Sequence, residues 1–251
     1  MDDAAIVGMG VVGKATALAF GIKKYFDLTG SNLTLKEVAD CRYVFICLPT
    51  PTVDGKCDTS LIRGVIRQIE GYRQRALYII RSTVIPSTAD AIMDELDMDR
   101  VISNPEFLSE DNWEFDARKP QMVIIGARDR IVADELNAYY LARYKYLEPL
   151  VTDNVTAEMI KYAFNTFYSL KVVFANELYD ICQRVKANYG VIQGLLTAHP
   201  WGSGNHFVVN YKGKRGVNGR CLPKDLEAFV TYSNSRLLKT VKEVNDAGFR
   251  N

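Results

Sequence analysis

The sequence has few residues of the kinds that would point to a metal, a polyanion or a membrane. Two of the 251 residues are histidines, so no convincing zinc site can be assembled and no metal is expected. The net charge of +1 argues against binding to nucleic acid or to a membrane surface. No apolar run approaches the roughly 20 residues of a membrane-spanning helix, and no signal peptide is recognisable. We therefore expect a soluble cytoplasmic protein.

The cysteines also lack the pattern of a disulfide-stabilised protein. Their number is odd and their spacings are unpaired, which is typical of reduced thiols in a cytoplasm. They stand at positions 41, 47, 57, 182 and 221. At 251 residues, the chain is long enough to form one large domain or two modest ones.

A glycine-rich turn near the N-terminus predicts a dinucleotide site. A short apolar run, residues 4–7, precedes a G-x-G-x-x-G pattern, and a run of helix formers up to residue 20 follows it. In such a strand–turn–helix unit, Gly8 makes the tight turn, Gly10 lets the pyrophosphate approach the backbone, and Gly13 lets the helix pack on the sheet. The first N–H groups of the helix then bind the phosphates. The expected cofactor contacts of this turn are Gly8, Gly10, Val11, Val12 and Gly13.

A second strand, residues 24–26, ends at Asp27. An acid about 20 residues after the glycine turn binds the ribose hydroxyls in this kind of unit, and no arginine follows it immediately, which favours NAD over NADP. The alternative is an ordinary turn aspartate before Gly30.

Alternating strands and helices continue to about residue 150, which predicts an α/β, Rossmann-like, doubly wound and mostly parallel sheet. Residues 157–187 then carry apolar side chains at helical intervals without proline or glycine, so we expect one long helix or two nearly continuous ones. We interpret residues 1–150 as an NAD-binding domain and residues 151–251 as a helical central domain for dimerisation. The strands are expected at 43–48, 77–80, 101–102 and 122–125, and helices at 61–69 and 87–96.

Three loops follow predicted strands at the sheet edge where ligands bind in such folds. They are Pro49-Thr50-Pro51, Ser82-Thr83-Val84 and the segment from Asn104 through Glu106 to Glu110. Each could also be plain turn chemistry, because proline, serine and asparagine are common in loops.

The long helix and a later loop hold further candidates. Lys161 and Asn165 are four residues apart and share a helix face, where an apolar setting would make the lysine a proton acceptor or an oxyanion donor. The alternative is the ordinary solvated side of a helix. Cys221 follows Gly216 and Gly219, which permit unusual backbone conformations, and precedes Lys224, which would favour the thiolate. This segment is therefore either a nucleophile loop or a glycine-rich surface turn with a cysteine.

These blocks, taken together and in order, resemble the nucleotide-sugar dehydrogenase family. The matching segments are the glycine turn, Leu48-Pro49-Thr50-Pro51, Ser82-Thr83-Val84, Asn104-Pro105-Glu106-Phe107-Leu108, Ala157-Glu158-Met159-Ile160-Lys161-Tyr162 with Asn165, and Cys221-Leu222-Pro223-Lys224-Asp225. The resemblance implies oxidation of the C6 alcohol of a nucleotide sugar, by default UDP-glucose, to a carboxylate with two NAD molecules. It further implies a homodimer.

The resemblance also implies roles for single residues. Cys221 would be the nucleophile, and Lys161, Asn165 and Asp225 would handle an ordered water, protons and oxyanions. Glu106 would assist hydrolysis. Thr83 and Glu110 would flank the nicotinamide and the water, and Thr50 and Lys224 would reach toward the cofactor.

The sequence departs from the family pattern in several places. In relatives the turn before the cysteine commonly reads G-F-G-G, whereas Val217 and Asn218 stand here at its second and third places. The segment 201–205 lacks the arginine that reaches a substrate across a dimer in relatives. Four basic residues could replace that charge, although a solvated basic loop is the preferred interpretation: Lys212, Lys214, Arg215 and Arg220.

The segment between Phe20 and Tyr43 is shorter than relatives usually have. The chain stops where relatives enter a second α/β domain, so it is a fragment, relies on a separate chain for that half, or binds substrate between protomers.

Two other functions stay open. A β-hydroxyacid dehydrogenase would use Lys161 and Asn165 but no cysteine, and would carry out one oxidation. A non-catalytic NAD-binding module that needs a partner chain would carry out none.

Overall fold

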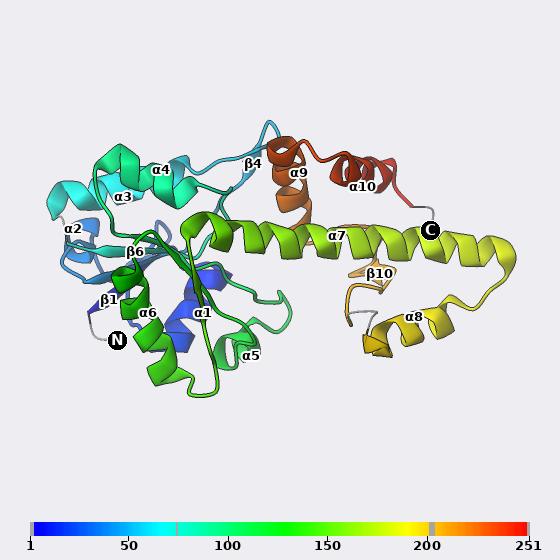
Figure 1. The fold of residues 1–251 in the computed structure, drawn as a ribbon, viewed down its shortest axis with the longest axis horizontal. Helices are drawn as coiled ribbons and strands as arrows, with labels where there is room; N and C mark the ends of the chain where they lie inside the picture. The colour runs from blue at the N-terminus through cyan, green and yellow to red at the C-terminus, as the bar shows by residue number, and fades with distance from the viewer. Residues whose placement is uncertain (1–2, 74, 201–203, 250–251) are drawn as a thin grey trace. The chain divides into compact units, whose positions relative to one another are not determined.

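The structure is a computed structural model, and it describes residues 3–73, 75–200 and 204–249. Figure 1 shows the fold of the chain as a ribbon. A seven-stranded sheet has the strand order β2-β1-β3-β6-β7-β8-β9. Neighbouring strands are parallel except for β7 and β8, so the predicted mostly parallel sheet is confirmed. The strands span Ala4–Val7 (β1), Lys24–Phe26 (β2), Tyr43–Ile46 (β3), Leu77–Ile80 (β6), Val101–Ser103 (β7), Ile124–Ala127 (β8) and Leu150–Thr152 (β9).

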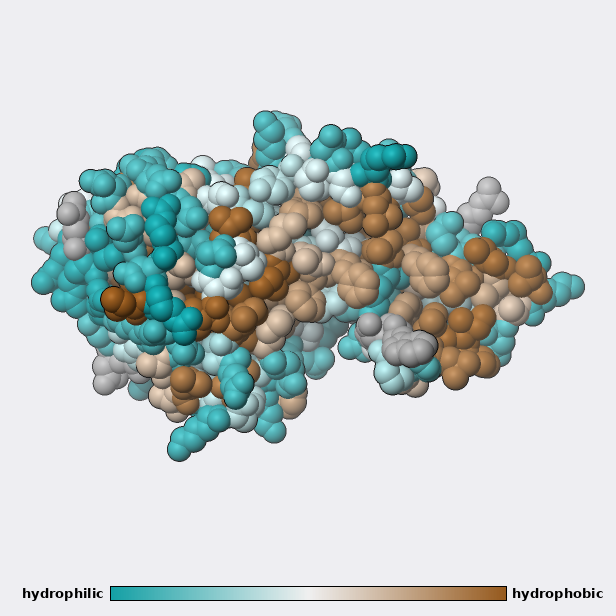
Figure 2. Space-filling model, in the orientation of Figure 1, coloured by the Kyte–Doolittle hydropathy of each residue, from teal (hydrophilic) through white to brown (hydrophobic). Residues whose placement is uncertain are grey.

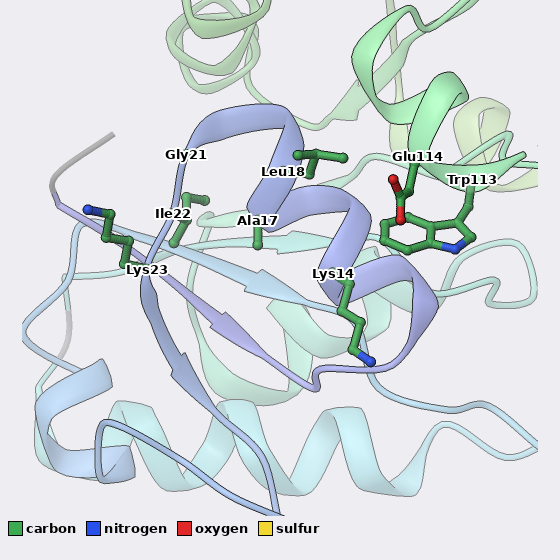
Figure 3. Close-up of a pocket in the computed structure, with 8 residues that line it drawn as sticks. All are labelled: Lys14, Ala17, Leu18, Gly21, Ile22, Lys23, Trp113 and Glu114. Carbon is green, nitrogen blue, oxygen red and sulfur yellow. The ribbon is translucent and has the colours of Figure 1, made fainter.

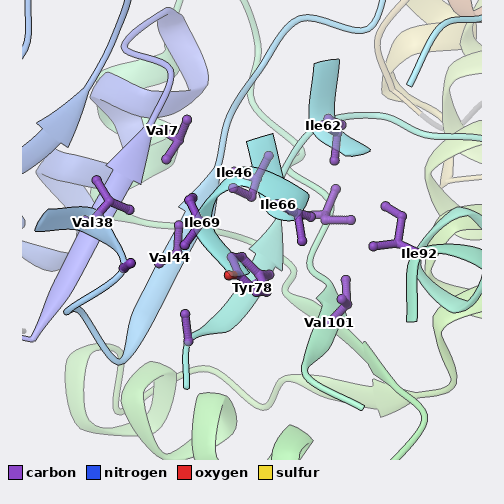
Figure 4. Packing of buried hydrophobic residues seen from close by; sticks show 14 of the residues in the cluster. Val7, Val38, Val44, Ile46, Ile62, Ile66, Ile69, Tyr78, Ile92 and Val101 are labelled. Carbon is purple, nitrogen blue, oxygen red and sulfur yellow. The ribbon is translucent and has the colours of Figure 1, made fainter. Parts of the chain in front are cut away.

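Helices cover both faces of this sheet. On one face, α2, α3 and α4 pack against alternate strand residues (Figure 4), and on the other face α1 and α6 do so, with α5 lying against α1. Because both faces are covered, β1, β3, β6 and β8 are buried along their whole lengths, which explains their continuous apolar runs. The helices are Val11–Phe20 (α1), Leu35–Val38 (α2), Ser60–Tyr72 (α3), Thr88–Leu96 (α4), Trp113–Arg118 (α5) and Arg130–Arg143 (α6).

Helix α7 runs without a break over the 32 residues Asn154–Val185, so one long helix is confirmed in place of two. Contacts among residues divide the chain into two compact units, residues 1–51 with 57–161 and residues 52–56 with 162–251. The division falls inside α7, later than residue 150. The reason is that β9 completes the sheet beside β8, and Ala157 of α7 packs directly on Gly126 of β8.

The second unit is mainly helical. One of its apolar clusters includes Val173, Leu226 and Val241, and another includes Cys182, Tyr189 and Phe207. Besides α7 it contains α8 (Tyr189–Ala198), α9 (Leu222–Ser233), α10 (Arg236–Ala247) and the hairpin of β10 (Asn210–Tyr211) and β11 (Lys214–Arg215). A second small sheet, β4 (Thr52–Val53) with β5 (Lys56–Cys57), was not predicted. None of the described helices, α7 included, is apolar enough over a sufficient length to cross a membrane.

Candidate functional site

The glycine turn is shaped by contacts that exclude larger residues. Gly8 has φ +95°, and a Cβ there would lie 2.6 Å from the carbonyl oxygen of Cys47. A Cβ at Gly13 would lie 1.9 Å from the carbonyl oxygen of Gly8, which agrees with the predicted packing of helix on sheet. A Cβ at Gly10, by contrast, would meet no atom within 4 Å. Gly10 is also the N-cap of α1 and offers no side-chain cap, so N–H groups of the first helical turn are left for an anion.

Asp27 lies directly after β2 and binds the glycine turn. Its Oδ2 accepts a hydrogen bond of 2.6 Å from the N–H of Met9, and its Oδ1 accepts from the N–H and the hydroxyl of Thr29. These bonds, the one from Met9 above all, hold the pKa of the Asp27 carboxyl below its usual range. Asp27 is therefore both a turn aspartate and a brace for the glycine turn, which the sequence did not indicate.

The loops after β3 and β6 meet at the carboxyl ends of these strands. The hydroxyl of Thr50 donates to the carbonyl oxygen of Thr83 over 2.7 Å, and the hydroxyl of Ser82 donates to that of Leu48 over 2.6 Å. Thr50 is buried. The structure thus brings together Thr50 and Thr83, which were predicted from loops 33 residues apart.

Lys161 and Glu106 form a buried ion pair in the first unit. Their side chains are 7% and 9% exposed, and the Lys161 Nζ lies 3.3 Å from Oε1 of Glu106 and 2.7 Å from its carbonyl oxygen. The same ammonium lies over the ring of Phe107 at 5.2 Å. The other carboxylate oxygen of Glu106 accepts from the N–H of Leu108, which fixes the carboxylate against its own loop. Two predicted residues from distant segments are therefore paired.

Asn165, Asp225 and Lys224 form a second group, in the helical unit. The amide nitrogen of Asn165 donates to Oδ2 of Asp225 over 2.6 Å, and Nζ of Lys224 lies 2.6 Å from Oδ1. Asp225, in the first turn of α9, is 1% exposed. The Asn165 amide therefore has a buried hydrogen-bond partner. The alternative of a solvated helix side is wrong, because Glu158, Lys161 and Asn165 are all buried.

Cys221 is exposed and is the N-cap of α9. The positive φ angles of the preceding turn belong to Gly216 (+80°) and Gly219 (+86°), as their residue type predicts. Asn218 instead uses its amide, which donates to the carbonyl oxygens of Tyr211, Lys214 and Gly216. At the one place of this turn where relatives have a glycine and this chain does not, the Asn218 side chain therefore holds the turn by hydrogen bonds.

Arg215 corrects the interpretation of the basic loop. Its side chain is 7% exposed, and its guanidinium donates to Asn176 and to the carboxylate of Asp180 while lying over the ring of Tyr179. Burial against α7 therefore removes Arg215 from the solvated group. The other three basic residues, Lys212, Lys214 and Arg220, are exposed. The segment 201–203, where the missing arginine was noted, lies outside the described residues.

Comparison with known proteins places these features in a family. Residues 22–143 match the NAD binding domain of the UDP-glucose/GDP-mannose dehydrogenase family, and residues 155–247 match its central domain. The chain belongs to this family. The glycine turn lies before the matched NAD-binding segment.

Individual members of the UDP-glucose/GDP-mannose dehydrogenase family and one structure outside it are also similar. The putative UDP-glucose 6-dehydrogenase YtcA of Bacillus subtilis is 30% identical over 246 residues, which are 91% of this chain and 56% of that protein. The chain spans about half the length of the curated relatives it matches. A UDP-glucose dehydrogenase from Pyrobaculum islandicum has a TM-score of 0.84 at 25% identity, covering 97% of this chain and 68% of that one. The 3-hydroxyisobutyrate dehydrogenase of Mycobacterium tuberculosis, at 13% identity and a TM-score of 0.73, shares the fold over 97% of this chain and 92% of that one.

Two further features belong to the first unit. Glu110, which the family resemblance places near the nicotinamide, is exposed. A cavity of about 420 Å³ lies between α1 and α5 (Figure 3), and none of its lining residues is a predicted site residue. Sequence reasoning also missed two sets of buried hydrogen bonds. Asn104 accepts from the hydroxyl of Tyr140 and donates to the carbonyl oxygen of Ile124, and Glu158 accepts from the N–H of Ala89 and the hydroxyl of Ser103. Their polarity inside apolar segments is the signal that could have identified them.

Proposed function

We propose that this chain carries the catalytic residues of an NAD-dependent nucleotide-sugar dehydrogenase that oxidises the C6 alcohol of UDP-glucose to a carboxylate. The observation that carries the proposal is the pair of buried polar groups, Lys161 with Glu106 and Asn165 with Asp225. Each group joins two sequence blocks that are at least 55 residues apart. Buried polar and charged groups are costly to the fold, so their presence in hydrogen-bonded pairs favours a functional reason.

We infer that residues 1–150 bind the cofactor and residues 151–251 carry the cysteine loop. The N–H groups of the first turn of α1 fit a pyrophosphate, since the turn has no side-chain cap and the space beside Gly10 is open. Val11 and Val12 would contribute two of these N–H groups, and Asp27 would accept from the ribose hydroxyls. Thr50, Thr83, Glu110 and Lys224 complete the proposed set. NAD, when bound, accepts one hydride in each oxidation.

Cys221 is the proposed nucleophile. The first oxidation turns the alcohol into an aldehyde, with loss of a hydride and a proton. The sulfur of Cys221 then bonds to the aldehyde carbon and forms a thiohemiacetal, which loses a second hydride and a proton to become a thioester. Water cleaves the C–S bond, releasing the carboxylate and restoring the thiol. Support comes from the exposure of Cys221 and from its place at a helix N-terminus, where N–H groups stabilise a thiolate.

The buried pairs supply the proton and charge management of these steps. The Lys161 ammonium donates to the oxyanion that forms when water attacks the thioester, and Glu106 holds the water and accepts its proton. Asn165 donates a second hydrogen bond to an oxyanion, while Asp225 fixes the orientation of the Asn165 amide. Preorganised donors of this kind are typically worth about 3 kcal/mol of transition-state stabilisation each.

The test is a panel of UDP- and GDP-sugars with NAD, in which NADH and sugar acid are both counted. We expect two NADH per UDP-glucose. Cys221→Ser should release at most one NADH per substrate and no sugar acid, whereas Cys182→Ala, a buried cysteine outside the proposed set, should behave as the wild type. One NADH from the wild type would favour the β-hydroxyacid dehydrogenase, whose fold this chain shares. A flat response across the panel would favour a non-catalytic module.

We further propose that the chain forms a homodimer through an exposed apolar stripe on α7. Phe167, Phe174 and Ile181 recur at intervals of seven residues and are each more than 40% exposed. Figure 2 shows apolar surface over the second half of α7 and over α8, where Val191 and Leu195 are also exposed. A contiguous apolar surface of this kind is typical of a protein–protein interface.

A further inference from the structure

Glu158 is a buried carboxylate that takes no part in the proposed reaction. It is 2% exposed and faces the N-terminus of α4. Its Oε2 accepts from the N–H of Thr88 at 3.1 Å, and its Oε1 accepts from the N–H of Ala89 at 2.9 Å and from the hydroxyl of Ser103 at 2.8 Å. The N-cap of α4, Ser87, has φ +76° and makes no side-chain cap bond. Glu158 therefore supplies from α7 the cap that α4 lacks.

The neighbouring residues of α7 are fixed against the same elements. Asn154 accepts from the N–H of Ser103 and donates to the carboxylate of Asp90, both over 2.9 Å. Ala157 packs so closely on Gly126 that a Cβ at Gly126 would lie 2.5 Å from its own. The first turns of α7 are thus held on α4, β7 and β8 by side chains three or four residues apart.

Two bonds then join the same pair of segments. Ser103, at the end of β7, binds Glu158 of α7. Three residues further along each segment, Glu106 binds Lys161. Successive helical residues are rotated by about 100°, so a turn of α7 about its axis by one residue would carry Lys161 away from Glu106. The Ser103–Glu158 bond and the α4 cap both oppose such a rotation.

We propose that Glu158 is a positioning residue that sets the rotation of the first turns of α7 and so holds Lys161 on Glu106. The importance of this for turnover rests on the proposed function, whereas the positioning itself does not. It can therefore be measured on the chain without a substrate.

The experiment measures how fast an amine-acylating reagent modifies Lys161, by mass spectrometry of the full chain. Glu158→Gln keeps the shape but replaces one acceptor oxygen by an NH2 group that faces a backbone N–H. We expect roughly a tenfold faster modification of Lys161, the factor for losing one buried hydrogen bond of about 1.4 kcal/mol. The matched control is Met159→Gln, on the next residue and exposed, which should leave the rate unchanged.

Turnover of UDP-glucose gives the second measurement. Glu158→Gln should lower kcat and leave KM for NAD unchanged. If Lys161 is labelled faster in Glu158→Gln but the wild type oxidises no nucleotide sugar, the positioning role is supported and the proposed function is contradicted. Unchanged labelling, with faster hydrogen exchange at Thr88 and Ala89, would reduce Glu158 to a helix cap and overturn the proposal. If Glu158→Gln fails to fold, the same labelling experiment is done on Ser103→Ala, which removes only the hydrogen bond from the Ser103 hydroxyl to Glu158.

Discussion

Two buried carboxylates close to α7 differ in how their charge is compensated. Glu106 faces the ammonium of Lys161, whereas Glu158 is surrounded by neutral donors, two N–H groups and a hydroxyl. Burial raises the pKa of Glu158 to about 7, and the hydrogen bond from the N–H of Ala89 opposes the shift most strongly. The two residues should therefore respond differently to pH and to substitution.

Glu158 should make stability depend on pH. Its pKa rises on folding from 4.5 to about 7, so the folded state binds the proton more tightly. The associated stability is complete below pH 4.5 and is lost as pH rises through 7. The loss is of the order of 3 kcal/mol, at 1.36 kcal/mol per pKa unit. Urea unfolding at pH 5 and pH 8 measures it. The stability of the wild type relative to that of Glu158→Gln should fall by about this amount over the range, and a constant difference would contradict the prediction.

Lys161→Met should destabilise the chain by about 3–5 kcal/mol, because it leaves the Glu106 carboxylate buried without its counter-charge. Lys161→Met with Glu106→Gln should recover part of this loss, since neither charge then remains. Urea unfolding of both single variants and the double variant gives the coupling between the two side chains. Additive effects would show that the ion pair contributes no coupling energy.

At the scale of elements, two glycines of the same turn should have different roles: Gly13 in packing the helix on the sheet, and Gly10 in binding the cofactor. Gly13→Ala should cost about 1–3 kcal/mol of stability, because its Cβ would meet the carbonyl oxygen of Gly8 at 1.9 Å. Gly10→Ala meets no protein atom within 4 Å, so it should leave stability unchanged and weaken NADH binding. Thermal unfolding and calorimetric titration with NADH measure the two effects. The control is Gly64→Ala, in an exposed and open position of α3. Equal NADH affinity in Gly10→Ala and the wild type would place the pyrophosphate elsewhere.

Much of the element pattern followed from local sequence. Strands covered by helices on both faces must be apolar throughout, so residues 43–46 and 77–80 could be recognised as strands. The short strands β4 and β5 could not, because two-residue strands carry no periodicity. The antiparallel direction of β8 could not be predicted either, since direction depends on how the connection crosses the sheet.

At the scale of the whole molecule, the apolar stripe on α7 makes a prediction about oligomeric state. Phe174→Asp places a charge in the stripe and should convert the proposed dimer into a monomer, halving the mass seen by light scattering. Phe115→Asp, which alters an equally exposed aromatic residue in the first unit, should leave the mass unchanged. A monomeric wild type would remove the stripe from consideration as a dimer interface.

The sequence by itself determined the alternation of strands and helices, the glycine turn and the identity of the polar candidates. These depend on residue type and spacing within short segments. Only the tertiary structure decided which candidates pair, because Glu106 with Lys161 and Asn165 with Asp225 join segments that approach one another only after folding. It also decided that the side chains of Arg215 and Glu158 are buried, since burial depends on the elements packed over a residue and not on the residue itself.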